Sequence, residues 1–126
     1  MTDKTQFMRW ETLRAKDLPG GVQRKVFSTD HIMVVQYIYE PGAVFPKHQH
    51  PQEQIVIVDK GELEFWIKEE KNKYHLRPGS VLAIPGDIPH GASVVGDEVV
   101  ESINIFHPIK EEFLSEAEQK PVIEQK

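Results

Sequence analysis

The chain has 126 residues, a formal net charge of -5 at pH 7 and a pI near 5.7. This length fits one domain with one hydrophobic core, and the acidic balance argues against a nucleic-acid surface, which would be basic. No apolar run is long enough to span a bilayer, and the polar N-terminus lacks the apolar stretch of a signal peptide. Cysteine is absent, which excludes disulfides and thiolate sites. We expect a cytoplasmic protein that binds neither nucleic acid nor membrane.

The expected domain covers residues 1–126, with an N-terminal arm over residues 1–21 and a core over about residues 22–107. Within the core, turn pairs such as Pro41-Gly42 and Pro78-Gly79 recur between short runs of β-branched and aromatic residues. This pattern predicts short antiparallel strands, and therefore an all-β jelly roll or small barrel. The expected strands are residues 22–28, 32–40, 54–59, 62–68, 73–77, 80–84, 91–95 and 98–106, of which 62–68 and 73–77 form a hairpin around a charged loop.

The chain changes character at Pro108, where the predicted C-terminal helix and tail (residues 108–126) begin. Proline at a helix start, acidic residues in the first turn and apolar residues four apart are typical of a short helix. We expect this helix to include Phe113 and Ala117 and to end before Pro121.

Three histidines form the candidate metal site. His48, His50 and Gln54 are two and four residues apart, and side chains at even spacing on an extended chain face the same side. His90 follows later in the chain, and three imidazoles with one oxygen donor make a metal-binding set. Glu53 has the opposite parity and should face away, although a β-bulge near Pro51 would reverse this. We expect Gln54 to be the oxygen ligand, with Glu53 as the alternative.

Two motifs around these residues resemble those of the cupin family. The first motif has Gly, His-x-His, an acidic ligand and Gly at fixed spacing; the matching residues are Gly42, His48, His50, Gln54 and Gly61. The second motif is matched by Gly79, Pro85 and His90, with Asp87 and Val94 in place of its second Gly and its Asn. The resemblance implies a small single-domain cupin with a jelly-roll barrel.

The run His48-Gln-His50-Pro-Gln-Glu53-Gln54 resembles a cupin subset in which the Gln is the ligand. This subset includes small cupins of pectin and alginate breakdown that open unsaturated uronate rings. The stretch from Phe106 to Phe113 is similar to their Phe-Ser-Pro-x-Arg-Glu-Asp-Phe, with His107 and Lys110 at the Ser and Arg positions. Their catalytic Asp corresponds to Asn104 here, which cannot act as a general base.

The resemblance and the strand alternation together suggest the other site residues. Asn104 and His107 are the candidate catalytic residues, and the candidate substrate-binding residues are Tyr37, Tyr39, Phe106 and Lys110. The expected cofactor is one divalent transition metal: Zn, Ni, Fe, Mn, Co or Cu. With Gln54 as the oxygen ligand, no protein ligand is negatively charged, so the ion keeps its full charge, favours an anionic substrate and acts as a Lewis acid. Small cupins commonly pair, so a homodimer is expected.

Three functional hypotheses remain open on these residues. The first is a metal-dependent isomerase or lyase acting on an anionic sugar acid or keto acid. The second is an iron- or copper-dependent dioxygenase, which the missing carboxylate ligand disfavours. The third is a non-catalytic module that binds a small molecule, which Asn104 favours.

Overall fold

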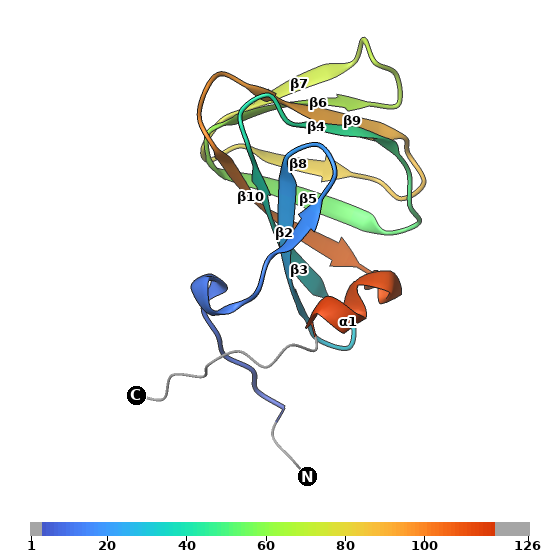
Figure 1. Ribbon diagram of the computed structural model, residues 1–126. Coiled ribbons are helices and arrows are strands. Elements are labelled where there is room, and N and C mark those ends of the chain that lie inside the picture. Colours follow the sequence, from blue (N-terminus) through green and yellow to red (C-terminus); the bar gives the residue numbers. More distant parts are fainter. Residues whose placement is uncertain (1–3, 118–126) are drawn as a thin grey trace.

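The computed structural model describes residues 4–117, which form two antiparallel sheets that pack face to face as a jelly-roll barrel (Figure 1). The six-stranded sheet has the order β1-β2-β3-β10-β5-β8, and the four-stranded sheet has the order β4-β9-β6-β7. The first sheet comprises β1 (Lys16–Leu18), β2 (Val22–Ser28), β3 (Met33–Tyr39), β10 (Val100–His107), β5 (Glu53–Lys60) and β8 (Val81–Ile84). The second comprises β4 (Val44–His48), β9 (His90–Val95), β6 (Glu62–Ile67) and β7 (Lys73–Leu76). The predicted all-β class is confirmed.

The hydrophobic core lies between the two sheets. Side chains alternate along each strand, so that every second residue of β3, β5 and β10 is buried. The largest core members with almost no exposed surface are Met33, Leu63, Ile84 and Phe106. The predicted hairpin of β6 and β7 is present, with Leu63 paired to Leu76.

Two strands were not among those expected. β1 is only three residues long, and its Lys-Asp-Leu sequence has no β-branched or aromatic residue that would signal a strand. β4 contains Pro46, which is typical of a turn, but β4 lies at the edge of its sheet, where a missing N–H costs no ladder hydrogen bond.

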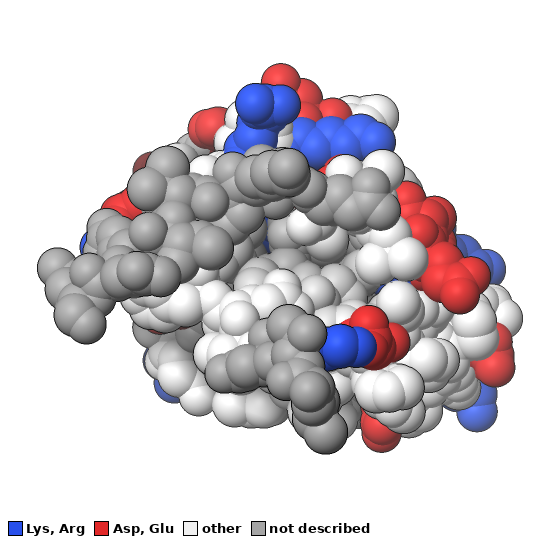
Figure 2. Space-filling model, turned by 90° about the horizontal axis from the view of Figure 1, so that it is seen from below, with Lys and Arg blue, Asp and Glu red and all other residues white. Residues whose placement is uncertain are grey.

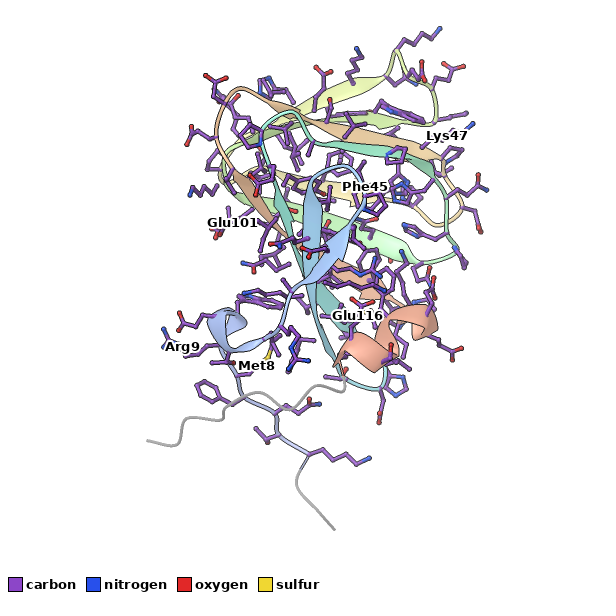
Figure 3. The ribbon with its side chains drawn as sticks, in the orientation of Figure 1. Met8, Arg9, Phe45, Lys47, Glu101 and Glu116 are labelled. Atoms are coloured by element: carbon purple, nitrogen blue, oxygen red, sulfur yellow. The ribbon has the colours of Figure 1, made fainter. Side chains whose placement is uncertain are left out.

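The C-terminal helical segment begins later than predicted, at Glu111 rather than Pro108. A 3-10 turn, η2 (Glu111–Phe113), leads into α1 (Leu114–Ala117), and another 3-10 turn, η1 (Trp10–Thr12), lies in the arm. Glu116 of α1 accepts two hydrogen bonds from the Arg24 guanidinium of β2, at 2.9 and 2.8 Å (Figure 3). The same guanidinium lies 3.7 Å from the centre of the Phe113 ring. These contacts fix the C-terminal segment against the six-stranded sheet.

None of the helices within residues 4–117 has the length and apolar character needed to cross a membrane. Residues 1–3 of the predicted arm and 118–126 of the predicted tail lie outside the described residues.

Candidate metal site

Three histidines come together inside the barrel. His48 ends β4, His90 begins β9, and the two are paired across the sheet. His50 lies in the loop between β4 and β5. Each ring can offer one nitrogen such that all three nitrogens lie within 4.8 Å of one another. The structure therefore brings together the three histidines that the sequence singled out.

Backbone carbonyls determine which ring nitrogen carries the proton. Each Nδ1 lies near a carbonyl oxygen: His48 near that of Pro46 at 3.0 Å, His50 near Gln52 at 3.1 Å and His90 near Ile88 at 2.8 Å. A carbonyl oxygen can only accept, so each Nδ1 carries the hydrogen and donates it. Each Nε2 is then left with a free lone pair, which is the tautomer that metal-binding histidines adopt.

The Nε2 atom of His90 supports this tautomer. It is buried and has no hydrogen-bond partner among the described residues. A buried polar atom without a partner is rare in folded proteins and commonly marks the place of an ion or a water. Because the lone pair faces the other two imidazoles, the chemistry of this set fits a transition-metal ion.

Gln54 completes the set from β5. Its side chain is buried, and its Oε1 lies 3.1 Å from Nε2 of His50. When His50 donates through Nδ1, both atoms of this contact carry lone pairs, and a cation between them relieves the repulsion. Glu53 is exposed on the opposite face of the strand, as the alternation predicted. The geometry thus makes Gln54, rather than Glu53, available as the oxygen ligand.

Asn104 orients the Gln54 amide. Nε2 of Gln54 donates to Oδ1 of Asn104 at 2.9 Å, while Nδ2 of Asn104 donates to Oγ of Ser102 at 2.9 Å. Because the Asn104 amino group is directed at Ser102, its oxygen must face Gln54. The Gln54 amino group is therefore turned toward Asn104 and its oxygen toward the histidines. Ser102 in turn is hydrogen-bonded to the Tyr39 hydroxyl.

The loop before β9 is fastened to the His50 loop. The backbone N–H of Asp87 donates to the carbonyl of His50 at 2.8 Å. Any side chain at Gly86 would collide with the carbonyl oxygen of Pro51, so only glycine permits this approach. The Pro85-Gly86-Asp87 run of the second motif therefore holds the loop that carries His50 close to the start of β9.

Burial keeps the imidazoles neutral. It lowers the pKa of His48 to about 4, with the neighbouring His90 acting in the same direction. Burial also lowers the pKa of His50 and His90, although the carbonyls at their Nδ1 atoms act in the opposite direction. Neutral imidazoles are available to a metal without first losing a proton.

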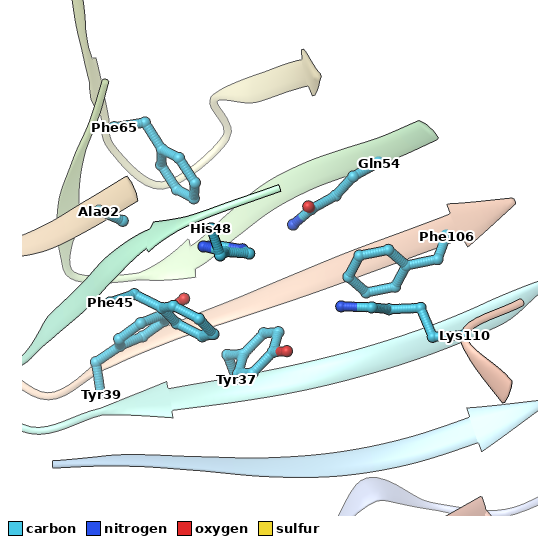
Figure 4. A pocket seen from close by; sticks show the side chains of 9 residues that line it. All are labelled: Tyr37, Tyr39, Phe45, His48, Gln54, Phe65, Ala92, Phe106 and Lys110. Atoms are coloured by element: carbon cyan, nitrogen blue, oxygen red, sulfur yellow. The ribbon is translucent and has the colours of Figure 1, made fainter. Parts of the chain in front are cut away.

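The cavity beside the histidines has a volume of about 10 Å³, enough for one ion or water. Figure 4 shows the residues that line it: Tyr37, Tyr39, Phe45, His48, Gln54, Phe65, Ala92, Phe106 and Lys110. Tyr37, Tyr39, Phe106 and Lys110, the predicted substrate-binding residues, are all among them. Phe45, Phe65 and Ala92 were missed. Strict alternation along β4 would place Phe45 on the face opposite to His48. The pairing of β4 with β9 is irregular between these two residues, so both reach the cavity.

Lys110 enters this cavity from the segment after β10. Its ammonium lies 4.9 Å from the centre of the Phe106 ring and 4.5 Å from that of Phe113, as cation–π contacts. Burial lowers the pKa of Lys110 to about 8, against the opposing effect of Glu112. Burial also raises the pKa of Tyr37 to about 12, so its hydroxyl stays protonated. The cavity thus offers hydrogen-bond donors and positive charge, and no carboxylate lines it.

His107 lies elsewhere. It is exposed at the end of β10, with the opposite parity to Asn104 and Phe106, and it lines a separate open hollow beside Asp30 and His31. The structure therefore does not bring His107 to the metal site.

The chain is an antiparallel jelly roll in which three histidines converge. These features define a class of barrel proteins with a candidate metal site inside the barrel. A family model described as "Cupin domain" matches residues 35–106, more than half of the chain. The chain belongs to the cupin family, as its motifs suggested.

Solved structures agree with this membership. KdgF from Halomonas sp. is 28% identical, with a TM-score of 0.79, over 87% of this chain and 99% of that one. An RmlC-like cupin from Shewanella frigidimarina is 24% identical, with a TM-score of 0.75, over 89% of this chain and 96% of that one. The cupin domain of Cnp3 from Schizosaccharomyces pombe is 10% identical, with a TM-score of 0.69, over 83% and 75% respectively. No match was found among curated protein sequences.

Proposed function

We propose that this cupin is a metal-dependent isomerase or lyase that acts on an anionic sugar acid or keto acid. One observation carries the proposal: His48 and Gln54, which can ligate a metal, share a buried cavity with Lys110, and no carboxylate lines that cavity. A divalent ion held by neutral ligands beside an ammonium makes a strongly positive cavity. Its natural partner is an anion, such as the carboxylate of a uronate or keto acid.

Each lining residue has a role in this proposal. His48, His50, His90 and Gln54 would hold the ion, which when bound supplies a Lewis acid for a substrate carbonyl. Lys110 pairs with the substrate carboxylate, and Tyr37 donates a hydrogen bond to a substrate oxygen. Because the pKa of Lys110 is lowered to about 8, Lys110 can also exchange a proton near neutral pH.

The cavity volume limits what enters in this conformation. About 10 Å³ holds an ion or a water but not a sugar acid, so a substrate has to displace a side chain. Lys110 has a long flexible stem and no hydrogen bond or ion pair to a side chain among the described residues, whereas Tyr37 lies against Arg24. We therefore expect Lys110 to move when a substrate binds.

The comparisons support the substrate class. The run from Phe106 to Phe113 resembles that of uronate ring-opening cupins, and KdgF from Halomonas matches over nearly its whole length. Asn104 is the main departure, because it replaces an acid with an amide that already bonds Gln54 and Ser102. A non-catalytic cupin that binds the same anions is the second candidate, and this fully engaged Asn104 favours it.

The first test is elemental analysis of untagged protein purified without chelators. The Gln54→Ala and Glu53→Ala variants are measured in parallel. We expect near-stoichiometric metal, weakened by Gln54→Ala and unaffected by Glu53→Ala. The loaded protein is then given unsaturated uronates and 2-keto acids. Turnover supports the enzyme, and tight binding without turnover supports the second candidate. Protein that stays free of metal after reloading would contradict the enzyme and leave the second candidate.

A further inference from the structure

Gln52 connects the two parts of the site from a position outside the cavity. It lies in the loop between β4 and β5, and only 7% of it is exposed. Its backbone carbonyl accepts the hydrogen bond from Nδ1 of His50. Its side-chain Nε2 donates to the backbone carbonyl of Ile109 at 3.2 Å. Because Ile109 immediately precedes Lys110, one residue contacts both the loop of a metal-binding histidine and the segment that carries the ammonium group.

The Gln52 side chain continues the attachment of this segment where the strand pairing stops. The pairing of β5 with β10 ends where Glu53 lies opposite His107. In the same register Gln52 would lie opposite Pro108, which has no N–H to donate. The Gln52 side chain donates instead to Ile109, one residue further along the chain. It therefore holds the segment just beyond the last backbone pair.

The burial of the Gln52 amide carries a cost. Its amino group faces the Ile109 carbonyl, because that oxygen can only accept a hydrogen bond. The amide oxygen, Oε1, is then buried without a hydrogen-bond partner among the described residues. Such atoms are rare in folded proteins, and an apolar side chain of similar shape would leave none. Stability alone therefore does not account for a glutamine at this position.

Lys110 depends on its backbone for its position. On the side of the molecule next to the chain ends, charged side chains lie mainly at the edges of an uncharged area (Figure 2). Lys110 differs from such surface charges because it is 7% exposed and reaches the cavity. The Phe106 and Phe113 rings hold its ammonium by cation–π contacts, which do not fix a single orientation. The point at which the side chain leaves the backbone therefore decides where the ammonium can reach.

The segment that carries Lys110 has a second attachment further along the chain. Glu116 accepts two hydrogen bonds from Arg24 of β2. Between Lys110 and Glu116 the chain turns, and the Phe113 N–H donates to the Lys110 carbonyl at 2.9 Å. That bond lies within the segment and does not attach it to the barrel. The Gln52 hydrogen bond is the attachment adjacent to Lys110 itself.

We propose that Gln52 is a positioning residue, which holds the backbone from which Lys110 reaches into the cavity and so sets the separation of the ammonium from the metal-binding histidines. The inference rests on the proposed binding of an anion between the two. An anion that contacts a metal ion and an ammonium together needs both at a fixed separation. Since Gln52 holds His50 through its backbone and Ile109 through its side chain, substitution of the side chain removes only the second contact.

The test compares the full-length, Zn²⁺-loaded wild type with Gln52→Met, using calorimetry with the 2-keto acid pyruvate. Gln52→Met is expected to weaken pyruvate binding by about 5-fold or more, because the ammonium is no longer held at the right separation. The Zn²⁺ affinity should stay within about 3-fold of the wild type, because the carbonyl that orients His50 remains. In a Lys110→Met background, Gln52→Met should have no further effect on pyruvate binding, because both changes act through the same group.

Gln36→Met is the matched control. Gln36 is a buried glutamine of β3, 9% exposed, and it does not line the cavity, so its variant should bind pyruvate as the wild type does. Unchanged pyruvate affinity in Gln52→Met, an additive loss in the double variant, or an equal loss of Zn²⁺ affinity would overturn the proposal. The same loss of pyruvate affinity in Gln36→Met would also overturn it.

Hydrogen exchange separates this proposal from the proposed function, because it needs no anion. In Zn²⁺-loaded Gln52→Met, the Phe113 amide should exchange about 10-fold faster than in the wild type, since the Lys110 carbonyl that accepts its bond is less firmly held. The amides of β10 should keep their rates. A wild type that binds no pyruvate would contradict the proposed anion site, and the exchange rates would then decide on Gln52. An unchanged Phe113 rate would exclude the positioning role.

Discussion

The inner face of the six-stranded sheet supplies much of the hydrophobic core but carries one polar cluster, and the outer face carries several apolar side chains. The inner face holds Gln54, Ser102 and Asn104 in a hydrogen-bonded chain. The outer face holds Ile55, Ile103 and Ile105, none of which belongs to the buried core. The difference teaches that the polarity of buried side chains on a strand follows the site they build rather than how deep they lie.

The largest effect is expected when one imidazole of the metal site is removed. We expect His90→Ala to lower metal affinity by more than about 100-fold, since loss of a direct ligand exceeds the ~10–100-fold of a supporting residue. Competition with a chromophoric chelator measures the affinity. His75→Ala, on the outer face of β7, is the control and should bind as the wild type does; equal loss in both variants would contradict the assigned site.

Two adjacent residues of β10 sharpen the comparison further. Asn104→Leu removes the acceptor that turns the Gln54 oxygen toward the histidines, and we expect metal affinity to fall about 10- to 100-fold. The visible absorption of the Co²⁺-loaded protein should also change, because the ligand field loses its fixed amide. Ile103→Ser, on the opposite face, is expected to leave both unchanged. A Co²⁺ spectrum unaltered by Asn104→Leu would show that Asn104 does not orient the ligand.

Lys110 tests the charge of the inner cavity. We expect Lys110→Met to weaken binding of a 2-keto acid to the metal-loaded protein by roughly 10-fold, as measured by calorimetry, because an ion pair with little solvent around it is lost. Lys110→Arg retains the charge and should bind within a few-fold of the wild type. Lys73→Met, an exposed lysine that pairs with Glu64, is the control. Unchanged affinity in Lys110→Met would exclude Lys110 from anion binding.

The smallest effect is that of pH on the metal-free protein. The pKa of His48 is about 4 in the folded state against 6.5 ordinarily, so the unfolded chain binds more protons between these values. Stability therefore rises with pH through this window, and the melting temperature should fall by a few degrees as the pH is lowered from 7 to 4. His48→Gln should flatten this dependence. A melting temperature that is flat or rises on acidification would contradict the neutral, buried imidazole.

The sequence predicted the fold class, most strands and the histidine set because spacing alone carries that information. Parity placed Gln54 inward and Glu53 outward correctly because the β5–β10 register is regular around Gln54 and shifts only at the far end of β5. Alternation could not place Phe45, because the β4–β9 pairing is irregular between Phe45 and His48. The strand β4 itself was not expected because Pro46 is typical of a turn. The carbonyl partners of the imidazoles also lay beyond sequence reasoning. Gln52 and Ile88 belong to loops whose path no pattern specifies, and Pro46 belongs to the unexpected strand β4.

His107 shows the limit of carrying a motif over position by position. It stands next to buried Phe106 in sequence, yet alternation turns it outward into a different hollow. The cytoplasmic location, the identity of the metal and the homodimer remain predictions.

The carbonyl groups that hold each imidazole by its Nδ1 atom have a consequence for metal selection. They fix the rings before any ion arrives, so the folded protein presents a ready set of three nitrogens and an amide oxygen. Such a set follows the general order of divalent affinities, with copper strongest, and does not favour one ion by charge. We therefore expect the identity of the bound metal to depend on which metal is available to the cell. Cells grown in zinc-rich and in nickel-rich medium should yield the same protein carrying different ions.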